Sequence, residues 1–408
     1  MVPRQRTALA FGAPGRSFSA AMEMTASRLR DTATPWLIVV LLGDVTCFGI
    51  VMPLLASYAA AFRADTTSIG VLVATYSAMH FLLAPVWGRL SDRIGRRPVL
   101  LLGLVGTLIS SVLFALADSF LLLMVSRIVA GGMGATLNVA QAYVADQSTP
   151  AARTRVMGLV GAAFGFGFIL GPTIGGITTR FGDAAPGLAA SVIATLNLGL
   201  ALATLREPPV HRPAFGAPTT PLPWRPLIAP FAAAIASTLA FTVLYVVFPL
   251  HAEQTLGYDR SRVSYLFAFV GLMTAVVQGG LVGTLSRRIG EGRLLLLGGL
   301  LMALGLGLLP RVSSGGGASF FLALAMLGIG FGFAGPAEAG YVSRTAPADL
   351  QGRILGSLQS VNSIARILGP VAAGVAMGSG GAPAAFMGAA AFAAVSGLLG
   401  LAMTHREG

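Results

Sequence analysis

The sequence contains no lysine, a single cysteine and few charged side chains of any kind. Charged residues make up 10% of its 408 residues, whereas a soluble protein carries about 25%. Without lysine there is no Gly-Lys-Ser/Thr phosphate loop, which excludes a P-loop ATPase within the chain. A lone Cys47 excludes an intramolecular disulfide and a cysteine-based metal cluster. We therefore expect no metal, no cofactor and no enzyme.

What the sequence does have is apolar stretches that recur almost without interruption. Hydrophobic residues make up 55% of the chain, and its mean hydropathy is +0.80. Lipid requires every backbone polar group to be satisfied internally, which long apolar helices achieve. The 53 glycines lie inside these runs, where small residues let membrane helices pack closely. The composition predicts an all-α integral membrane protein embedded in a lipid bilayer.

The apolar runs divide the chain into twelve expected crossings, since each crossing needs about 20 residues. We place them near residues 36–58, 69–90, 99–117, 120–144, 156–179, 187–205, 227–250, 262–284, 293–310, 318–342, 354–376 and 383–403. The expected organisation is a disordered cytoplasmic tail (1–35), a six-helix bundle (36–205), a cytoplasmic linker (206–225), a second six-helix bundle (226–403) and a short tail (404–408).

Arginine placement predicts the orientation of these crossings. The net charge is +12, but the arginines lie in short segments between apolar runs, so we expect no nucleic-acid partner. Inner loops of membrane proteins carry the excess of basic residues. An inside N-terminus leaves few arginines outside, namely Arg63, Arg180, Arg260, Arg262 and Arg311. We therefore expect both termini to be cytoplasmic.

The two predicted bundles share sequence patterns. Residues 88–95 (GRLSDRIG) resemble residues 283–290 (GTLSRRIG), and Leu170-Gly-Pro resembles Leu368-Gly-Pro. The offsets are 195 to 198 residues. Parallel duplication of a six-helix unit is the design of rocker-type transporters, which bind substrate between the halves near mid-membrane.

The strongest motif is the loop GRLSDRIGRRP at residues 88–98, between the second and third expected crossings. Glycine there permits a tight turn with positive φ, and the aspartate can pair with arginines. The loop resembles that of the major facilitator superfamily, G-x-L-S/A-D-R-x-G-R-R, at every fixed position. The resemblance implies a cytoplasmic gate at Gly88, Asp92, Arg93, Gly95, Arg96 and Arg97. The second copy departs from the pattern, because Arg287 stands where Asp92 does.

A second motif lies in the fifth expected crossing. Its glycines recur every four residues and offer one flat face for helix packing, and its proline permits a bend. The pattern resembles the antiporter motif of the drug/proton antiporters in that superfamily, which implies efflux. The residues are Gly167, Gly171, Pro172, Gly175 and Gly176.

Two charges lie inside apolar crossings. Asp44 lies within the first, and Arg127 within the fourth, where Arg127-Ile-Val-Ala-Gly131 resembles the superfamily's R-x-x-x-G motif. A charge in a spanning segment costs about 2.5–3.5 kcal/mol, so Arg127 requires a partner or a water-filled cavity. Burial and a nearby guanidinium shift the pKa of a carboxyl group in opposite directions. We expect Asp44 to be the proton site, tuned by Arg127; a permanent structural ion pair is the alternative.

Further stretches, including Tyr76 to Pro85 and Ala142 to Asp146, look like bacterial tetracycline/proton antiporters. That group carries acidic residues within spans three and nine, whereas 99–117 and 293–310 contain none. Other polar residues are candidates for the substrate cavity or, alternatively, for helix–helix hydrogen bonds, and Arg366 could bind an anionic substrate or pair with Glu338. The cavity candidates are His80, Asn138, Gln141, Tyr245, Gln278, Glu338, Gln359, Asn362 and Arg366, and Asn197 is also considered.

The patterns together predict a monomeric, multi-pass protein of a bacterial cell membrane. Its expected function is proton-coupled export of small amphipathic drug-like compounds by alternating access, with tetracycline-like compounds as one candidate class. Two alternatives stay open: a metabolite symporter or facilitator on the same scaffold, and a membrane sensor or scaffold that transports nothing.

Overall fold

The computed structural model describes residues 35–134, 136–147, 150–208, 224–312, 317–345 and 350–404. All regular secondary structure in these ranges is helical. Most of the expected N-terminal tail, most of the linker (209–223) and residues 405–408 lie outside the described residues.

The first half contains six crossings. The first crossing, Pro35–Ala61, ends in the 3₁₀ turn η1 (Met52–Leu54) and in α2 (Leu55–Ala61). The fourth crossing consists of two helices, α5 and α6, and the fifth ends in the 3₁₀ turn η2. The remaining bounds are α3 (Thr66–Ile94), α4 (Arg96–Ala115), α5 (Phe120–Gly132), α6 (Thr136–Gln147), α7 (Pro150–Thr178), η2 (Thr179–Phe181) and α8 (Ala185–Thr204).

The second half repeats this order. Its second crossing is interrupted by a short π-helix, η3, between α10 and α11. The bounds are α9 (Trp224–Leu256), α10 (Arg260–Val276), η3 (Val277–Leu281), α11 (Val282–Ile289), α12 (Glu291–Leu308), the 3₁₀ turn η4 (Leu309–Arg311), α13 (Ala318–Thr345) and α14 (Gln351–Thr404).

The described residues contain eleven helical segments long and apolar enough to span a membrane. The last, α14, has 54 residues and would be roughly 80 Å long at 1.5 Å per residue, far more than one bilayer requires. It breaks at Gly381, where φ is 72° and ψ is −178°. The break divides α14 into two crossings, so the fold has the twelve crossings that the hydropathy predicts.

Local chemistry explains where the helices begin. Asp65 accepts a hydrogen bond from the Ser68 backbone N–H at 2.9 Å, and Asp259 does the same for Arg262 at 2.8 Å. These side chains cap α3 and α10, because a helix leaves its first N–H groups without partners. At the opposite ends of these crossings, Gly95 (φ 105°) and Gly290 (φ 80°) turn the chain into the next helix. Only glycine adopts this backbone conformation without strain.

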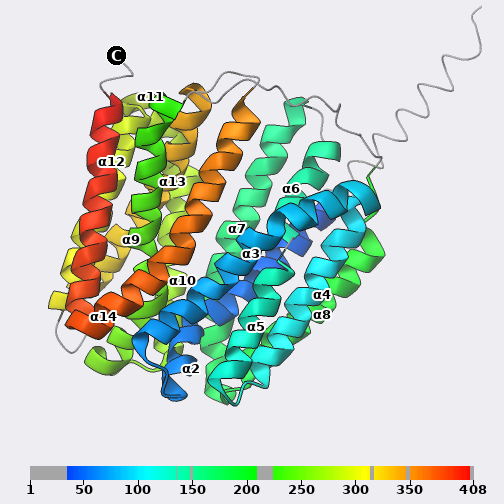
Figure 1. Ribbon diagram of the computed structural model, residues 1–408, viewed down its shortest axis with the longest axis horizontal. Helices are drawn as coiled ribbons and strands as arrows, with labels where there is room; N and C mark the ends of the chain where they lie inside the picture. The colour runs from blue at the N-terminus through cyan, green and yellow to red at the C-terminus, as the bar shows by residue number, and fades with distance from the viewer. Residues whose placement is uncertain are drawn as a thin grey trace, which may run out of the picture.

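The two halves form separate bundles that lie side by side in Figure 1, with the first half in blue to green and the second in green to red. Helices α3 and α14 pack against each other across the boundary, and so do α7 and α10. These four helices therefore form the interface between the halves.

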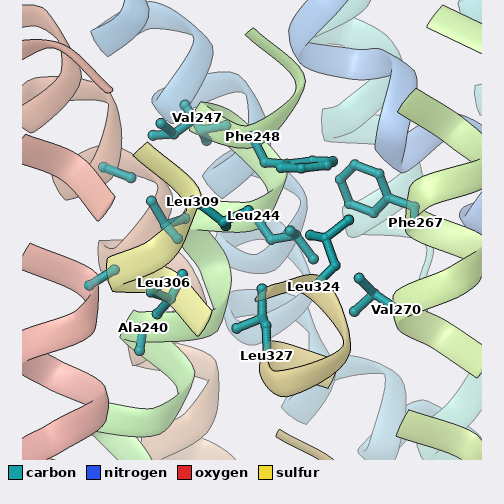
Figure 2. Close-up of a cluster of buried hydrophobic side chains, with 14 of the residues drawn as sticks. Ala240, Leu244, Val247, Phe248, Phe267, Val270, Leu306, Leu309, Leu324 and Leu327 are labelled. Carbon is teal, nitrogen blue, oxygen red and sulfur yellow. The ribbon is translucent and has the colours of Figure 1, made fainter. Parts of the chain in front are cut away.

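The apolar cores show that the halves are joined at one end only. One cluster combines Val51 to Ala59 and the start of α3 with many side chains of the second half. Part of it is drawn in Figure 2, where Phe248, Phe267 and Leu324 converge. At the other end each half has its own cluster, around Tyr143 in the first half and around Ile354 in the second.

Glycines of the four interface helices, and of η3 and α11 that continue α10, confirm this asymmetry. At the joined end, a side-chain atom added to Gly70 would collide with the backbone of Pro370, and one at Gly374 with Thr66. At the other end, a side-chain atom added to any of several interface glycines would meet nothing within 4 Å, namely Gly88, Gly158, Gly161, Gly279, Gly280, Gly283, Gly352 and Gly356. The halves are therefore closed at the end of Arg180 and Arg260 and open at the end of the 88–98 loop.

Candidate functional site

A cavity of about 420 Å³ lies between the two halves. Ligand sites in proteins typically have about 300–1,000 Å³. The first crossing and α3 to α7 line it from the first half, and α9, α13 and α14 line it from the second. Because its walls belong to both halves, any rocking of the halves changes the cavity.

Asp44 is the one carboxyl group among the residues that line this cavity. The Thr107 hydroxyl of α4 donates a hydrogen bond of 2.7 Å to its Oδ1. Among the residues that the structure describes, Asp44 forms no ion pair. A carboxyl group held by a neutral hydroxyl beside a cavity can gain or lose a proton without breaking an ion pair.

Arg127 also lines the cavity but is only 2% exposed. Its Nε donates to the Ser126 hydroxyl at 3.2 Å, and its guanidinium lies 5.8 Å from the centre of the Phe114 ring. Aromatic rings attract cations over their faces. The ion pair of Asp44 with Arg127, which the sequence left open as an alternative, is not formed in the described part of the chain, although both residues lie at the same cavity.

Arg366 of α14 faces the cavity from the second half. Its Nη2 donates to the Ser363 hydroxyl at 3.3 Å. Glu338, the partner that sequence suggested as one alternative, is buried in α13 and accepts a hydrogen bond of 2.7 Å from Ser237. In the described residues Glu338 and Arg366 form no ion pair, so Arg366 is left facing the cavity.

The other candidates fall into three groups. His80, Tyr245 and Gln359 line the cavity, and Gln278 lines a smaller neighbouring one of about 230 Å³. Two amides make helix–helix hydrogen bonds instead: Asn362 accepts from Thr238 at 3.0 Å, and Asn197 donates to the Val40 carbonyl at 2.9 Å. Asn138 and Gln141 of α6 are exposed and are not among the lining residues.

Aromatic side chains form much of the remaining wall. Phe241 and Phe331 stack with ring centres 3.7 Å apart in the second half, and Phe48 and Tyr76 lie 5.0 Å apart in the first. Aromatic faces bind flat apolar groups well. The cavity therefore combines isolated charges with an aromatic lining, which suits an amphipathic ligand.

The sequence interpretation missed several hydroxyl groups that line the cavity. They are Ser77, Thr107, Ser110, Ser111, Thr238, Thr242 and Ser363. Serine and threonine in helices usually bond to their own backbone, as Thr195 does with the Ser191 carbonyl at 2.8 Å. No pattern in the sequence separates the hydroxyls that face a cavity from those that do not.

The glycine motif of α7 packs against the first crossing, on which Asp44 lies. A side-chain atom added to Gly171 would lie 2.6 Å from the Gly49 Cα, and one at Gly175 would lie 3.0 Å from the Ile50 carbonyl. Gly176 instead meets the second half, because the Ser261 hydroxyl of α10 donates to its carbonyl at 2.6 Å. The motif thus joins the Asp44 helix to the boundary between the halves.

The 88–98 loop forms a cluster of charges at the open end. Arg96 lies between two carboxylates, 2.5 Å from Asp92 and 3.0 Å from Asp146 at the end of α6. The first backbone N–H groups of α4, those of Arg96 and Arg97, donate to the Glu207 carboxylate at 2.5 and 2.9 Å. Arg93 is exposed. Arg96, rather than Arg93, is therefore the centre of this cluster.

The second half contains the same cluster with reversed charges. Glu291 stands at the position of Arg96, accepts a hydrogen bond of 2.7 Å from Ser286, and pairs with Arg344 of α13. Arg344 stands at the position of Asp146, and Ser286 at that of Ser91. The central residue is therefore basic in the first half and acidic in the second, and its partner has the opposite charge in each half. The copy that looks degenerate at Arg287 is thus a charge-reversed equivalent.

Polar contacts also hold the closed end. Arg260 of α10 pairs with Asp183 at 2.6 Å and lies 4.7 Å from the centre of the Tyr58 ring. The Thr66 hydroxyl donates to the Gly374 carbonyl at 2.8 Å. Both contacts cross the boundary between the halves, so they must break if this end opens.

Comparison with known proteins places the chain among transporters. The sequence model of the Major Facilitator Superfamily matches residues 37–370 and 231–407 of this chain. The tetracycline resistance protein, class C, of Escherichia coli is 35% identical over 357 residues, which cover 82% of this chain and 88% of that protein. The class D protein of Salmonella ordonez is 32% identical over 350 residues, covering 82% and 86%. The crystal structure of the human organic anion transporter MFSD10 superposes with a TM-score of 0.69 at 22% identity, covering 91% of this chain and 99% of that one.

Proposed function

Because this chain belongs to the Major Facilitator Superfamily, and is therefore a multi-pass membrane transporter and not an enzyme, we propose that it exports small amphipathic drug-like compounds in exchange for protons. The observation that carries the proposal is Asp44, a carboxyl group at the cavity between the halves, held by the Thr107 hydroxyl and by no ion pair in the described residues. Relatives named for tetracycline resistance support export of a drug.

The proposed cycle starts from the conformation described above, with the open end facing the cytoplasm as the arginine bias predicts. Substrate enters the cavity, and the proton on Asp44 leaves to the same side. The halves then rock about the cavity, the contacts of Arg260 and Thr66 break, and substrate leaves outward. Asp44 takes a proton from that side before the halves return. One proton enters for each substrate exported.

The energy for uphill export comes from the proton gradient. One elementary charge moved across 100 mV yields about 2.3 kcal/mol, and a pH difference adds to this. Asp44 carries a proton only while the empty carrier returns. If the empty carrier also returned without a proton, substrate would move without proton entry, so that step must be slow. An aspartate at this position is required for coupling but not for substrate binding.

The test measures substrate-driven proton efflux from acid-loaded proteoliposomes with the protein in known orientation. The substrate panel consists of aromatic dyes and tetracycline. Asp44→Asn keeps the size and polarity of the side chain but cannot release a proton, and we expect it to abolish uphill transport and proton efflux. The matched control, Asp118→Asn, changes an exposed carboxylate between α4 and α5 and leaves both unchanged.

Two results would contradict the proposal. Full uphill transport by Asp44→Asn would show that Asp44 is not the proton site. Exchange of labelled substrate across the membrane without any proton signal in the wild-type protein would identify a facilitator on the same scaffold. Uptake of labelled substrate is measured beside proton efflux in the same proteoliposomes, so loss of coupling is distinguished from loss of transport.

A further inference from the structure

We propose that the substrate is an amphipathic aromatic anion, whose acidic group binds Arg366 while its rings lie among the aromatic side chains of the cavity. This inference rests on the proposed export function, because it names the substrate class of the same cavity. It is carried by the charges that line the cavity and by the surroundings of Arg366.

The side chains that line the cavity carry an excess of positive charge. They include two guanidinium groups, Arg127 and Arg366, but only one carboxyl group, Asp44. An ionised Asp44 balances one guanidinium and a protonated Asp44 balances neither. In a low-dielectric surrounding such an excess attracts an anion and repels a cation. The cavity is therefore electrostatically complementary to a negatively charged ligand in either protonation state of Asp44.

Arg366 has donors to spare. Its described hydrogen bond is a long one, 3.3 Å from Nη2 to the Ser363 hydroxyl, and a guanidinium carries several more N–H groups. The carboxylate of Glu338 is bonded to Ser237 and is not among the groups that line the cavity. The planar fork of arginine matches a carboxylate or a sulfonate with two parallel hydrogen bonds. An acidic ligand group would complete the coordination of Arg366.

Arg127 is less suited to this role. It is 2% exposed, its Nε bonds to Ser126, and its guanidinium already lies over the Phe114 ring. Arg366, by contrast, is partly accessible and lies near the phenol rings of Tyr76 and Tyr245. Arg366 is therefore the more accessible of the two guanidinium groups to a ligand in the cavity.

The aromatic lining supplies the apolar half of the recognition. Phe241 and Phe331 stack beside the same cavity, and Phe48 and Tyr76 face it from the other half. Flat rings bind to such faces in offset-stacked or edge-to-face arrangements. The required ligand therefore has a planar aromatic body with one acidic group, rather than a sugar or a short peptide.

The charge of the substrate has a consequence that can be measured. Export of a monoanion in exchange for one proton moves two elementary charges in the same electrical direction. Export of a neutral compound moves one, and export of a monocation moves none. An inside-negative potential then drives export of an anion more strongly than export of its neutral analogue.

The test uses matched ligands in which only the head group changes. Binding of radiolabelled naphthoate, naphthamide and naphthylmethylammonium to the purified full chain is measured, together with the same three forms of anthracene. We expect the carboxylates to bind about tenfold or more tightly than the amides and ammonium compounds. Arg366→Gln should remove this preference while amide binding stays unchanged, and Arg366→Lys should keep part of it. Arg293→Gln, an exposed arginine of α12, serves as the matched control.

Several outcomes would overturn the inference: no binding by any acid of the panel, tighter binding of the amides or ammonium compounds, or an unchanged preference in Arg366→Gln that still elutes as a single species. Failure of the export proposal looks different. Carboxylate binding that depends on Arg366, without proton movement in proteoliposomes, would keep the anion site and remove proton exchange. Proton exchange driven by an ammonium compound would keep the export proposal and remove the anion site.

Discussion

Arg96 of α4 and Glu291 of α12 occupy equivalent positions 195 residues apart, and each forms an ion pair with the end of a neighbouring helix in its own half, at the open end of the molecule. The charges are opposite, but the geometry is conserved: a serine five residues earlier binds the central group in both halves, at 2.6 Å for Ser91 and 2.7 Å for Ser286. A hydroxyl can do this because it both donates and accepts.

We therefore expect the second cluster to tolerate a reversal of its charges. Arg344→Glu places a negative charge beside the buried Glu291 and should lower stability by about 1–3 kcal/mol and reduce transport. The double variant Glu291→Arg with Arg344→Glu recreates the polarity of the Arg96–Asp146 pair and should recover most of the lost stability and transport. Thermal unfolding in detergent and transport in proteoliposomes measure the two effects.

Arg293→Glu is the control for this swap, because Arg293 is exposed, forms no ion pair among the described residues, and lies two positions after Glu291, on another face of α12. It should change stability very little. A double variant no better than Arg344→Glu alone would show that the two clusters are not interchangeable in polarity.

Hydropathy was sufficient to predict the crossings because it measures length and apolarity, which lipid dictates. Each of the twelve expected segments coincides with an observed crossing. Hydropathy could not predict how the helices are interrupted. The division of the fourth crossing after Gly132 and the π-helix at Val277–Leu281 leave apolarity unchanged, and they depend on backbone hydrogen bonds within packed helices.

The cavity was harder to predict than the fold. A charge within an apolar run is expensive, so Asp44, Arg127 and Arg366 stand out in the sequence, and all three line the cavity. Their partners do not stand out. Whether a guanidinium pairs with a carboxylate depends on side-chain directions across helices. Neither of the pairs that the sequence left open as alternatives, Arg127 with Asp44 and Arg366 with Glu338, is formed in the described residues. The charge-reversed cluster was overlooked because comparison by identity treats Arg287 as a loss.

Gly381 is expected to be irreplaceable at the break in α14. Its φ of 72° with ψ of −178° belongs to a region that other residues occupy only with a strain of about 1–3 kcal/mol. Gly381→Ala should lower the unfolding temperature, measured in detergent. Gly388→Ala lies in the helix after the break, in open space, and should leave stability unchanged or raise it, because alanine favours helix. Equal effects of the two substitutions would show that the break does not require glycine.

The cap of α3 should make a small pH-dependent contribution to stability. The Ser68 backbone N–H and hydroxyl donate to Asp65, and these bonds hold the pKa of Asp65 below its usual value. A lowered folded-state pKa stabilises the protein at pH above the unfolded-state pKa, about 3.9, and this stabilisation is lost as the pH falls through the folded-state value. Asp65→Asn should therefore be slightly less stable than the wild type at neutral pH, and the difference should shrink as the pH falls through the folded-state pKa of Asp65. A gap that widens in acid would contradict this.

The register of α3 against α14 predicts which residues meet when the open end closes. The helices run antiparallel, with Thr66 facing Gly374 and Gly70 facing Pro370. Eighteen residues form about five full turns of a helix, so Gly88 lies on the same face of α3 as Gly70, and Gly352 on the same face of α14 as Pro370. Continuing the register therefore brings Gly88 of the loop motif onto Gly352.

Cysteine cross-linking tests this contact. In a Cys47→Ser background, which has no other thiol, Gly88→Cys and Gly352→Cys should be joined by a short bifunctional reagent only when the open end closes. Asp183→Cys and Arg260→Cys, at the closed end, should be joined only in the conformation described here, because that ion pair crosses the boundary. Substitutions that weaken the closed end, such as Gly70→Ala, should raise the yield of the cross-link at the open end and lower the yield of the one at the closed end. Both cross-links rising together would mean that the two ends do not alternate, and the rocking cycle would then be wrong.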